Sequence, residues 1–298
     1  MDVWIPITVA AAFCQNLRSA LQKRLTERLF HEEAAYVRFC YALPFAAAFV
    51  LVLASPGGRD MPVPNASWFW NMLAGSFFQA LGTVALVRSF AHRNFAASTA
   101  YSKTETVQAA AFGFVILGDA LTAMALGGIV VSLVGVLVLS VRSAAGPRAL
   151  VKSGLGRGAW LGIAAGAGFA VSAVCYRAAS LALPEGEFYV RAAVTLLGAT
   201  AVQTLGMGAY LAWRDARALV RVARSWRASI WVGLAGMLAS AGWFSAMTLM
   251  PAAYVRALGQ VELLFAFVAG LLLFRERVRP AEVGGAALVV LGLVLLLW

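Results

Sequence analysis

Charged residues are scarce in this sequence, where they make up 12% of 298 residues. Soluble globular domains carry about 25%. Hydrophobic residues account for 62% of the chain, and the mean hydropathy is +0.82. This composition excludes an ordinary soluble domain and is typical of a chain that lies mostly within a membrane.

Histidine and cysteine are also rare. The two histidines, His31 and His92, fall in predicted loops, whereas Cys14, Cys40 and Cys175 fall in predicted membrane spans without metal-ligand spacing. The sequence contains neither a nucleophile elbow nor a Gly-Lys-Ser/Thr phosphate loop. We therefore expect no disulfide framework, no metal, no cofactor and no enzymatic activity, and we do not expect an ATP-driven pump.

The apolar residues are organised into stretches of about 20 residues, the length that crosses a hydrocarbon core about 30 Å thick. The first stretch follows only Met1-Asp2-Val3 and lacks the basic start and small-residue cleavage site of a signal peptide. We predict an all-α membrane protein with ten transmembrane helices. They cover residues 4–22, 33–54, 68–90, 96–117, 121–141, 159–178, 187–209, 229–249, 252–274 and 281–298.

The sequence contains an internal repeat. Tyr36-Val37-Arg38 recurs as Tyr189-Val190-Arg191 at an offset of 153, and Gly127-Gly128 recurs as Gly284-Gly285 at an offset of 157. The second offset also places Glu105 on Glu262. The sequence therefore predicts a five-helix repeat at 1–141, a basic cytoplasmic linker at 142–157 and a second five-helix repeat at 158–298.

Basic residues predict the orientation of the spans. The odd-numbered loops hold sixteen lysines and arginines, from Lys23 to Arg279, and the even-numbered loops hold Arg59 alone. The positive-inside rule then places the odd loops in the cytoplasm and both termini outside. Because five spans make a half, the second repeat is expected to be inserted upside down, as in many secondary transporters.

The resemblance to a known family rests on the ends of both halves. The turn Phe274-Arg275-Glu276-Arg277 is followed by Gly284-Gly285 and Gly292, and Leu117-Gly118-Asp119 is followed by Gly127-Gly128 and Gly135. This pattern resembles EamA-type transporters of the drug/metabolite transporter superfamily over essentially the whole chain, with Asp119 where the family usually has Glu. The resemblance implies a membrane transporter with a central cavity lined by helices one, three, four, six, eight and nine. It does not identify a substrate.

Two carboxylates lie near the middle of predicted spans, Glu105 in the fourth helix and Glu262 in the ninth. A charge at the bilayer centre costs about 2.5–3.5 kcal/mol on insertion scales, so each needs a compensating role. Lys103 points about 200° away from Glu105 around their helix, and we expect it to reach a neighbouring helix, Glu262 or a substrate. Lys103 and Gln260 are equivalent under the repeat, and Gln108 shares a face with Glu105.

Further candidates are polar side chains on the helices that the resemblance assigns to the cavity. Buried polar groups of this kind also hold helices together, so each has a structural alternative. The arginines near span ends, Arg38 and Arg191 among them, are expected to extend toward the membrane surface. The complete set of candidate substrate-binding or coupling residues is Glu105, Glu262, Lys103, Gln260, Arg256, Tyr101, Gln108, Gln15, Asn16, Gln79, Tyr176 and Trp243.

We expect a secondary active transporter in the plasma or inner membrane that exports a small polar metabolite, such as an amino acid, by alternating access with proton coupling. Export follows only from the resemblance. The alternative is a multidrug or organic-cation efflux transporter, and a passive channel or a membrane enzyme is disfavoured. Expected partners are a small-molecule substrate, membrane lipid and protons, but not nucleic acid, and one copy of the chain is expected to suffice. The net charge of +11 is explained by the basic cytoplasmic loops.

Overall fold

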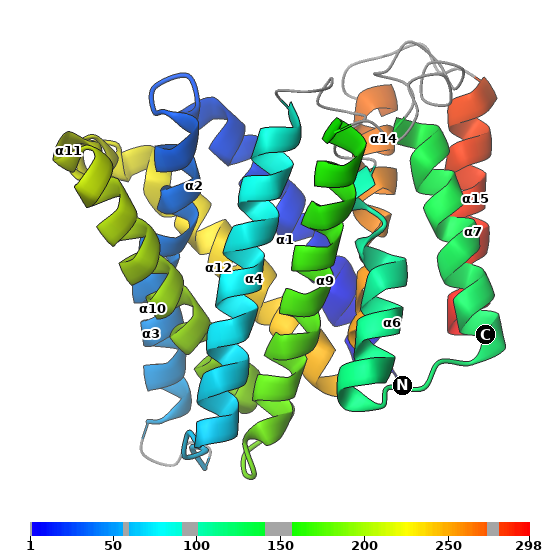
Figure 1. The fold of residues 1–298 in the computed structure, drawn as a ribbon, viewed down its shortest axis with the longest axis horizontal. Coiled ribbons are helices and arrows are strands. Elements are labelled where there is room, and N and C mark those ends of the chain that lie inside the picture. Colours follow the sequence, from blue (N-terminus) through cyan, green and yellow to red (C-terminus); the bar gives the residue numbers. More distant parts are fainter. Residues whose placement is uncertain (1, 56–59, 91–100, 141–156, 273–279) are drawn as a thin grey trace. The chain divides into compact units, whose positions relative to one another are not determined.

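The computed structural model describes residues 2–55, 60–90, 101–140, 157–272 and 280–298 (Figure 1). Every regular element within these residues is a helix, as predicted. Among the described residues, five helical stretches are long and apolar enough to cross a membrane, and two shorter apolar helices accompany them. The chain is a multi-pass, all-α membrane protein. The linker predicted at 142–157 lies outside the described residues except for Arg157, as does the Phe274–Arg277 turn.

The helices form two compact units. The first contains Met1–Ser76 and Tyr176–Leu249, and the second contains Phe77–Cys175 and Met250–Trp298. Each unit takes helices from both halves of the sequence, so the units do not follow the repeat. The division of the chain into repeats at 1–141 and 158–298 stays a prediction from the sequence.

In the first unit, α1 packs along α12, and α10 packs against α2, α3 and α12. Gly242 permits the close approach of α12 to α1, because a Cβ atom there would lie 2.7 Å from the Ala11 Cβ atom. The helices of this unit are α1 (Trp4–Leu25), α2 (His31–Cys40), α3 (Ala42–Leu53), the start of α4 (Ala66–Phe90), the end of α9 (Arg157–Ala182), α10 (Phe188–Arg214), α11 (Ala216–Arg224) and α12 (Trp226–Leu249).

The predicted second span is not one regular helix, because α2 and α3 meet at Tyr41. Pro44 lies in the first turn of α3, where its ring and its missing N–H disturb the bond that residue 44 would donate to Cys40. At this junction, the Tyr41 hydroxyl donates to the Val222 carbonyl oxygen at 3.1 Å. This bond attaches the junction to α11, a nine-residue helix that the sequence analysis did not predict.

The second unit contains the rest of α4 and α9 with α6 (Glu105–Leu117), α7 (Ala123–Ser140), α13 (Ala252–Leu258), α14 (Val261–Leu272) and α15 (Pro280–Leu297). The Gly118 turn after α6 is confirmed. Gly118 has a φ of 68°, and the Asp119 N–H bonds back to the Gly113 carbonyl, which is a glycine helix stop. A substituent at Gly118 would be strained by this backbone conformation.

The closest helix packing in the second unit joins α7 and α15. A Cβ atom at Gly292 would lie 2.5 Å from the Ser132 amide nitrogen, and one at Gly135 would lie 2.6 Å from the Val289 nitrogen. Only glycine leaves room for backbones this close, as in small-residue interfaces between membrane helices. Of the glycines shared by the two halves, Gly128, Gly135, Gly285 and Gly292 therefore let α7 and α15 pack closely, whereas Gly127 and Gly284 face open space.

Candidate functional site

The predicted fourth helix is interrupted beside its charged residues. Regular α-helix resumes at Glu105, after a tight turn at Lys103 and Thr104. In this turn, the Thr106 N–H bonds to the Lys103 carbonyl three residues back, and the Thr104 and Thr106 hydroxyls donate to the Tyr101 and Lys103 carbonyls. Threonine hydroxyls compete with the regular helical bonds in this way. The prediction of a continuous helix through 96–117 was wrong at this turn.

The ninth predicted span, 252–274, is interrupted in the same manner, because α13 ends at Leu258 and α14 begins at Val261. Here the Gln260 N–H bonds to the Ala257 carbonyl, and the Leu263 N–H bonds to the Gln260 carbonyl. The Leu263–Gln260 bond lies 157 positions after the equivalent Thr106–Lys103 bond, so both halves place the same tight turn at the same point. Tight 3₁₀ turns within a helix often mark functional hinges.

Four charges of the second unit gather at these two turns. The Lys103 ammonium forms an ion pair with the Glu262 carboxylate, which confirms that Lys103 reaches a neighbouring helix. The Arg256 guanidinium lies 3.9 Å from the Glu105 carboxylate. Each of the four side chains is mostly buried and keeps between 13% and 19% of its surface exposed. Two cations and two carboxylates leave the cluster with no net charge.

Gln260 connects the two turns and is only 3% exposed. Its amide nitrogen donates to the Thr106 hydroxyl oxygen at 2.7 Å, and its amide oxygen accepts a bond from the Ser132 hydroxyl of α7. Thr106 in turn donates to the Lys103 carbonyl at 3.0 Å. One buried amide therefore ties the turn that carries Glu262 to the turn that carries Lys103.

Helix α9 supports the first turn through its backbone. A Cβ atom at Gly166 would lie 2.8 Å from the Ser102 carbonyl oxygen, so the two backbones touch. The Gln108 amide nitrogen donates to the Thr104 hydroxyl at 2.9 Å and to the Ile163 carbonyl at 3.3 Å. Gln108 is thus hydrogen-bonded to the same turn that carries Lys103.

The first unit brings other candidates together. The Trp243 indole N–H of α12 donates to the Gln15 side-chain oxygen of α1 at 3.0 Å. The Tyr176 hydroxyl donates to the Ser76 hydroxyl at 3.2 Å and accepts a bond from the Gln203 amide at 3.0 Å. The Tyr176 ring also packs against that of Phe244, with ring centres 4.6 Å apart.

The remaining candidates have less defined surroundings. Asn16 follows Gln15 on α1, and Gln79 lies on the part of α4 that belongs to the second unit. The Tyr101 carbonyl closes the first tight turn, and its side chain is partly buried. The central cavity implied by the family resemblance stays a prediction, because the structure describes the two units separately.

Sequence reasoning missed Thr106, Ser132, Ser76 and Gln203, which complete these hydrogen-bond networks. At the offset of 157, Thr106 corresponds to Leu263 and Ser132 to Val289, so the symmetry that revealed Glu105 and Glu262 could not reveal them. Gln203 could have been found as an amide within an apolar span, which needs a hydrogen-bond partner there.

The chemistry available at the charge cluster is binding and proton exchange. In each ion pair, the carboxylate can exchange its basic partner for a cationic group of a solute, and the basic side chain can exchange its carboxylate for an anionic group of a solute. Within the described residues, no group of three or more His, Cys, Asp or Glu side chains could hold a metal ion.

Comparison with known proteins bears on the class of the molecule and not on its substrate. The sequence profile of the EamA-like transporter family matches residues 2–141 and 156–298. No curated protein matches the chain significantly. A solved structure titled only "Crystal structure of protein" superimposes with a TM-score of 0.68 and is 16% identical, covering 98% of this chain and 95% of its own. At that identity, the likeness shows the shared fold.

Proposed function

Since the chain belongs to the EamA-like transporter family, we propose that it is a secondary active transporter that exports a small zwitterionic metabolite, such as an amino acid, by alternating access. The charge cluster of Lys103, Glu105, Arg256 and Glu262 is proposed as its substrate and coupling site. The single observation that carries this proposal is the pairing of both mid-span carboxylates with cations at interrupted helices.

The balance of charges supports a zwitterion. A substrate carboxylate can replace Glu262 or Glu105 beside a basic side chain, while a substrate ammonium replaces Lys103 or Arg256 beside a carboxylate. Each exchange keeps the site neutral, which matters because an unpaired charge within the membrane is costly. Direction is proposed from the family resemblance alone.

The alternative, efflux of organic cations, is less well supported by these contacts. A lone cation would displace Lys103 or Arg256 from its carboxylate and add a positive charge to a neutral cluster. Loss of a proton from the cluster would compensate for the added positive charge, so this alternative predicts that cations are exchanged for protons. Uptake of amino acids and of lipophilic cations into proteoliposomes, measured with and without a pH gradient, distinguishes the two substrate classes.

The coupling proposal is tested with Glu105→Gln and Glu262→Gln, which keep the size of the side chain and remove its titratable charge. We expect each variant to insert and fold but to lose substrate flux, and at least one to lose the acceleration by an imposed pH gradient. Asn71→Ala serves as the control, because the Asn71 amide bonds only to Ser67 within its own helix. Parent-like flux and pH response in both glutamine variants would exclude the two carboxylates from the mechanism.

We also propose that the protein resides in the plasma or inner membrane with both termini outside, supported by the bias of basic residues between odd and even loops. A reporter that is active only in the cytoplasm, fused after Trp298, is expected to be silent. Fusion of the same reporter within the 142–156 linker should be active. Activity at the C-terminus would reverse the orientation.

A further inference from the structure

Helix α11 joins two long helices at the membrane boundary. It lies between α10, which ends at Arg214, and α12, which begins at Trp226. Both of these helices are long and apolar enough to cross a membrane, and eleven residues separate them. A helix in so short a connection lies at the membrane surface, where amphipathic helices contact lipid headgroups and the upper acyl chains.

One side of α11 is fixed to the protein. Val222 and Ala218 are buried, and Val222 belongs to an apolar core with Leu25, Val37 and Val232. The Arg221 guanidinium donates to Glu33, which is 2% exposed, and to Asp215, so α11 is bound to α2 by charge as well. These contacts hold the orientation of the helix and determine which side chains face outward.

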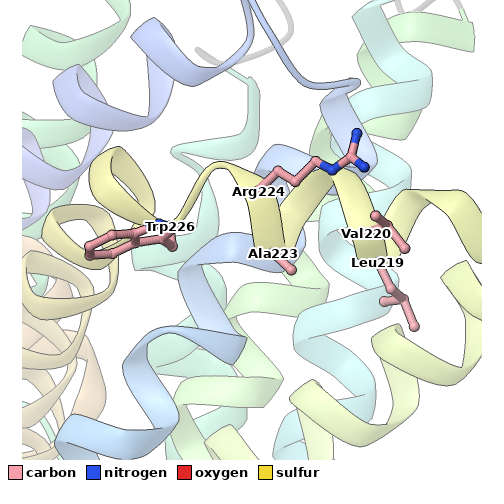
Figure 2. Close-up of a pocket in the computed structure, with 5 residues that line it drawn as sticks. All are labelled: Leu219, Val220, Ala223, Arg224 and Trp226. Carbon is pink, nitrogen blue, oxygen red and sulfur yellow. The ribbon is translucent and has the colours of Figure 1, made fainter.

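The outward side forms a shallow, open depression, here named the α11 surface, lined by Leu219, Val220, Ala223, Arg224 and Trp226 (Figure 2). Val220 is 50% exposed and Trp226 is 53% exposed. In Figure 2 the Arg224 side chain extends along the helix toward Val220, its neighbour one turn earlier. Apolar side chains and a guanidinium therefore share one accessible face.

The cations of this face have no direct salt-bridge partner among the described residues, and Asp215 acts on Arg217 only as a nearby charge. Arg224 and Arg217 are exposed and lie 80° to 100° around the helix from Ala216, next to Val220. In the part of the chain that the structure describes, the side chains of Arg217 and Arg224 form no ion pair, whereas Arg221 of α11 and Arg214 at the end of α10 do. An anion held outside the protein is the complement that these two guanidinium groups lack.

We propose that the α11 surface, together with Arg217 beside it, binds an anionic phospholipid, with Arg217 and Arg224 on the phosphate headgroup and Leu219, Val220 and Trp226 against the upper acyl chain. Each basic residue near an anionic membrane surface adds to the attraction between protein and lipid, and neighbouring apolar side chains add stability when they are buried among the acyl chains. Trp226 suits the boundary because indole rings are enriched there. The site does not depend on the identity of the transported substrate.

The test measures lipid binding by native mass spectrometry and by the shift in thermal unfolding on adding phosphatidylglycerol or phosphatidylcholine. The purified full chain is expected to retain phosphatidylglycerol preferentially. Arg217→Gln and Arg224→Gln should each lower this binding roughly fivefold, and together more, with little change for phosphatidylcholine. Leu219→Ser with Val220→Ser should weaken binding of both lipids.

Two controls make the result specific. Arg28→Gln removes an exposed cation outside the surface and should leave phosphatidylglycerol binding unchanged, and Arg224→Lys should keep most of it. Inorganic phosphate should not displace the lipid. Equal loss in Arg28→Gln, an unchanged lipid preference in the double glutamine variant, or displacement by phosphate would each overturn the proposal. Because no flux is measured, these outcomes are distinct from failure of the proposed transport function.

Discussion

Gln260 is the side chain whose removal should most directly separate the two tight turns. Gln260→Leu keeps a similar volume but removes two hydrogen bonds, one to Thr106 and one from Ser132. Hydrogen bonds between membrane helices contribute about 0.6 kcal/mol on average and up to about 1.7 kcal/mol. Two such bonds predict a loss of roughly 1–3 kcal/mol in the free energy of unfolding.

The assay is equilibrium unfolding in mixed micelles, combined with a double-mutant cycle. Gln260→Leu and Thr106→Val should each destabilise the protein, and together they should cost less than the sum of the two losses. The difference, about 0.6–1.7 kcal/mol, is the coupling through their bond. Asn71→Leu, which removes an amide that bonds within one helix, should stay within about 0.5 kcal/mol of the parent.

The functional consequence is measured on the same variants. If Gln260 holds the turns in register, Gln260→Leu should lower substrate flux by more than its stability loss explains, although Lys103 and Glu262 are both retained. Gln260→Asn keeps the amide but shortens the side chain, so its flux should stay below that of the parent. A coupling energy within about 0.3 kcal/mol of zero, or parent-like flux in Gln260→Leu, would refute the reasoning.

Three further predictions follow from other contacts. Lys103→Met should destabilise the protein by leaving the Glu262 carboxylate without its cation, and the double variant Lys103→Met with Glu262→Gln should recover stability in mixed-micelle unfolding without recovering flux. Gly292→Ala should cost about 1–3 kcal/mol in the same assay, because its Cβ atom meets the Ser132 backbone, whereas Gly284→Ala faces open space and should be harmless. The hydrogen bond from Arg221 lowers the pKa of Asp215 below its ordinary 3.8. The stability that Asp215 adds to α11 is therefore complete above pH 3.8 and is lost as the pH falls through the lowered pKa. Hydrogen exchange of the α11 amides should rise in that pH range, and Asp215→Asn should abolish this pH-dependent rise.

The helical fold and its division into spans could be predicted because hydropathy and length dominate in a membrane. Glu105 and Glu262 could be found because a charge within an apolar span is conspicuous and the repeat marks both. The contact of Lys103 with another helix could be predicted from its angular position relative to Glu105 alone. These inferences rest on periodicity and charge, which single sequences express clearly.

The interruptions of the fourth and ninth helices could not be predicted from the same signals. Lys103-Thr104 and Gly259-Gln260 lie in short polar stretches inside otherwise apolar spans, and hydropathy averaged over about 20 residues does not show a helix boundary within such a span. Thr106 and Ser132 are common as packing residues in membrane helices, and only the fold shows that they converge on Gln260. Helix α11 was missed because nine residues with three arginines were interpreted as a basic loop.

The equivalence of Lys103 and Gln260 has a consequence for the history of the chain. At one position of the ancestral unit, the first half now supplies a cation for Glu262, and the second half supplies a neutral amide that fastens the turns together. A protein assembled from two first halves would have a second lysine in place of the fastening amide, and one assembled from two second halves would rely on Arg256 alone for its cations. The two predicted halves therefore differ in what they supply at this position, a cation in the first and a neutral amide in the second.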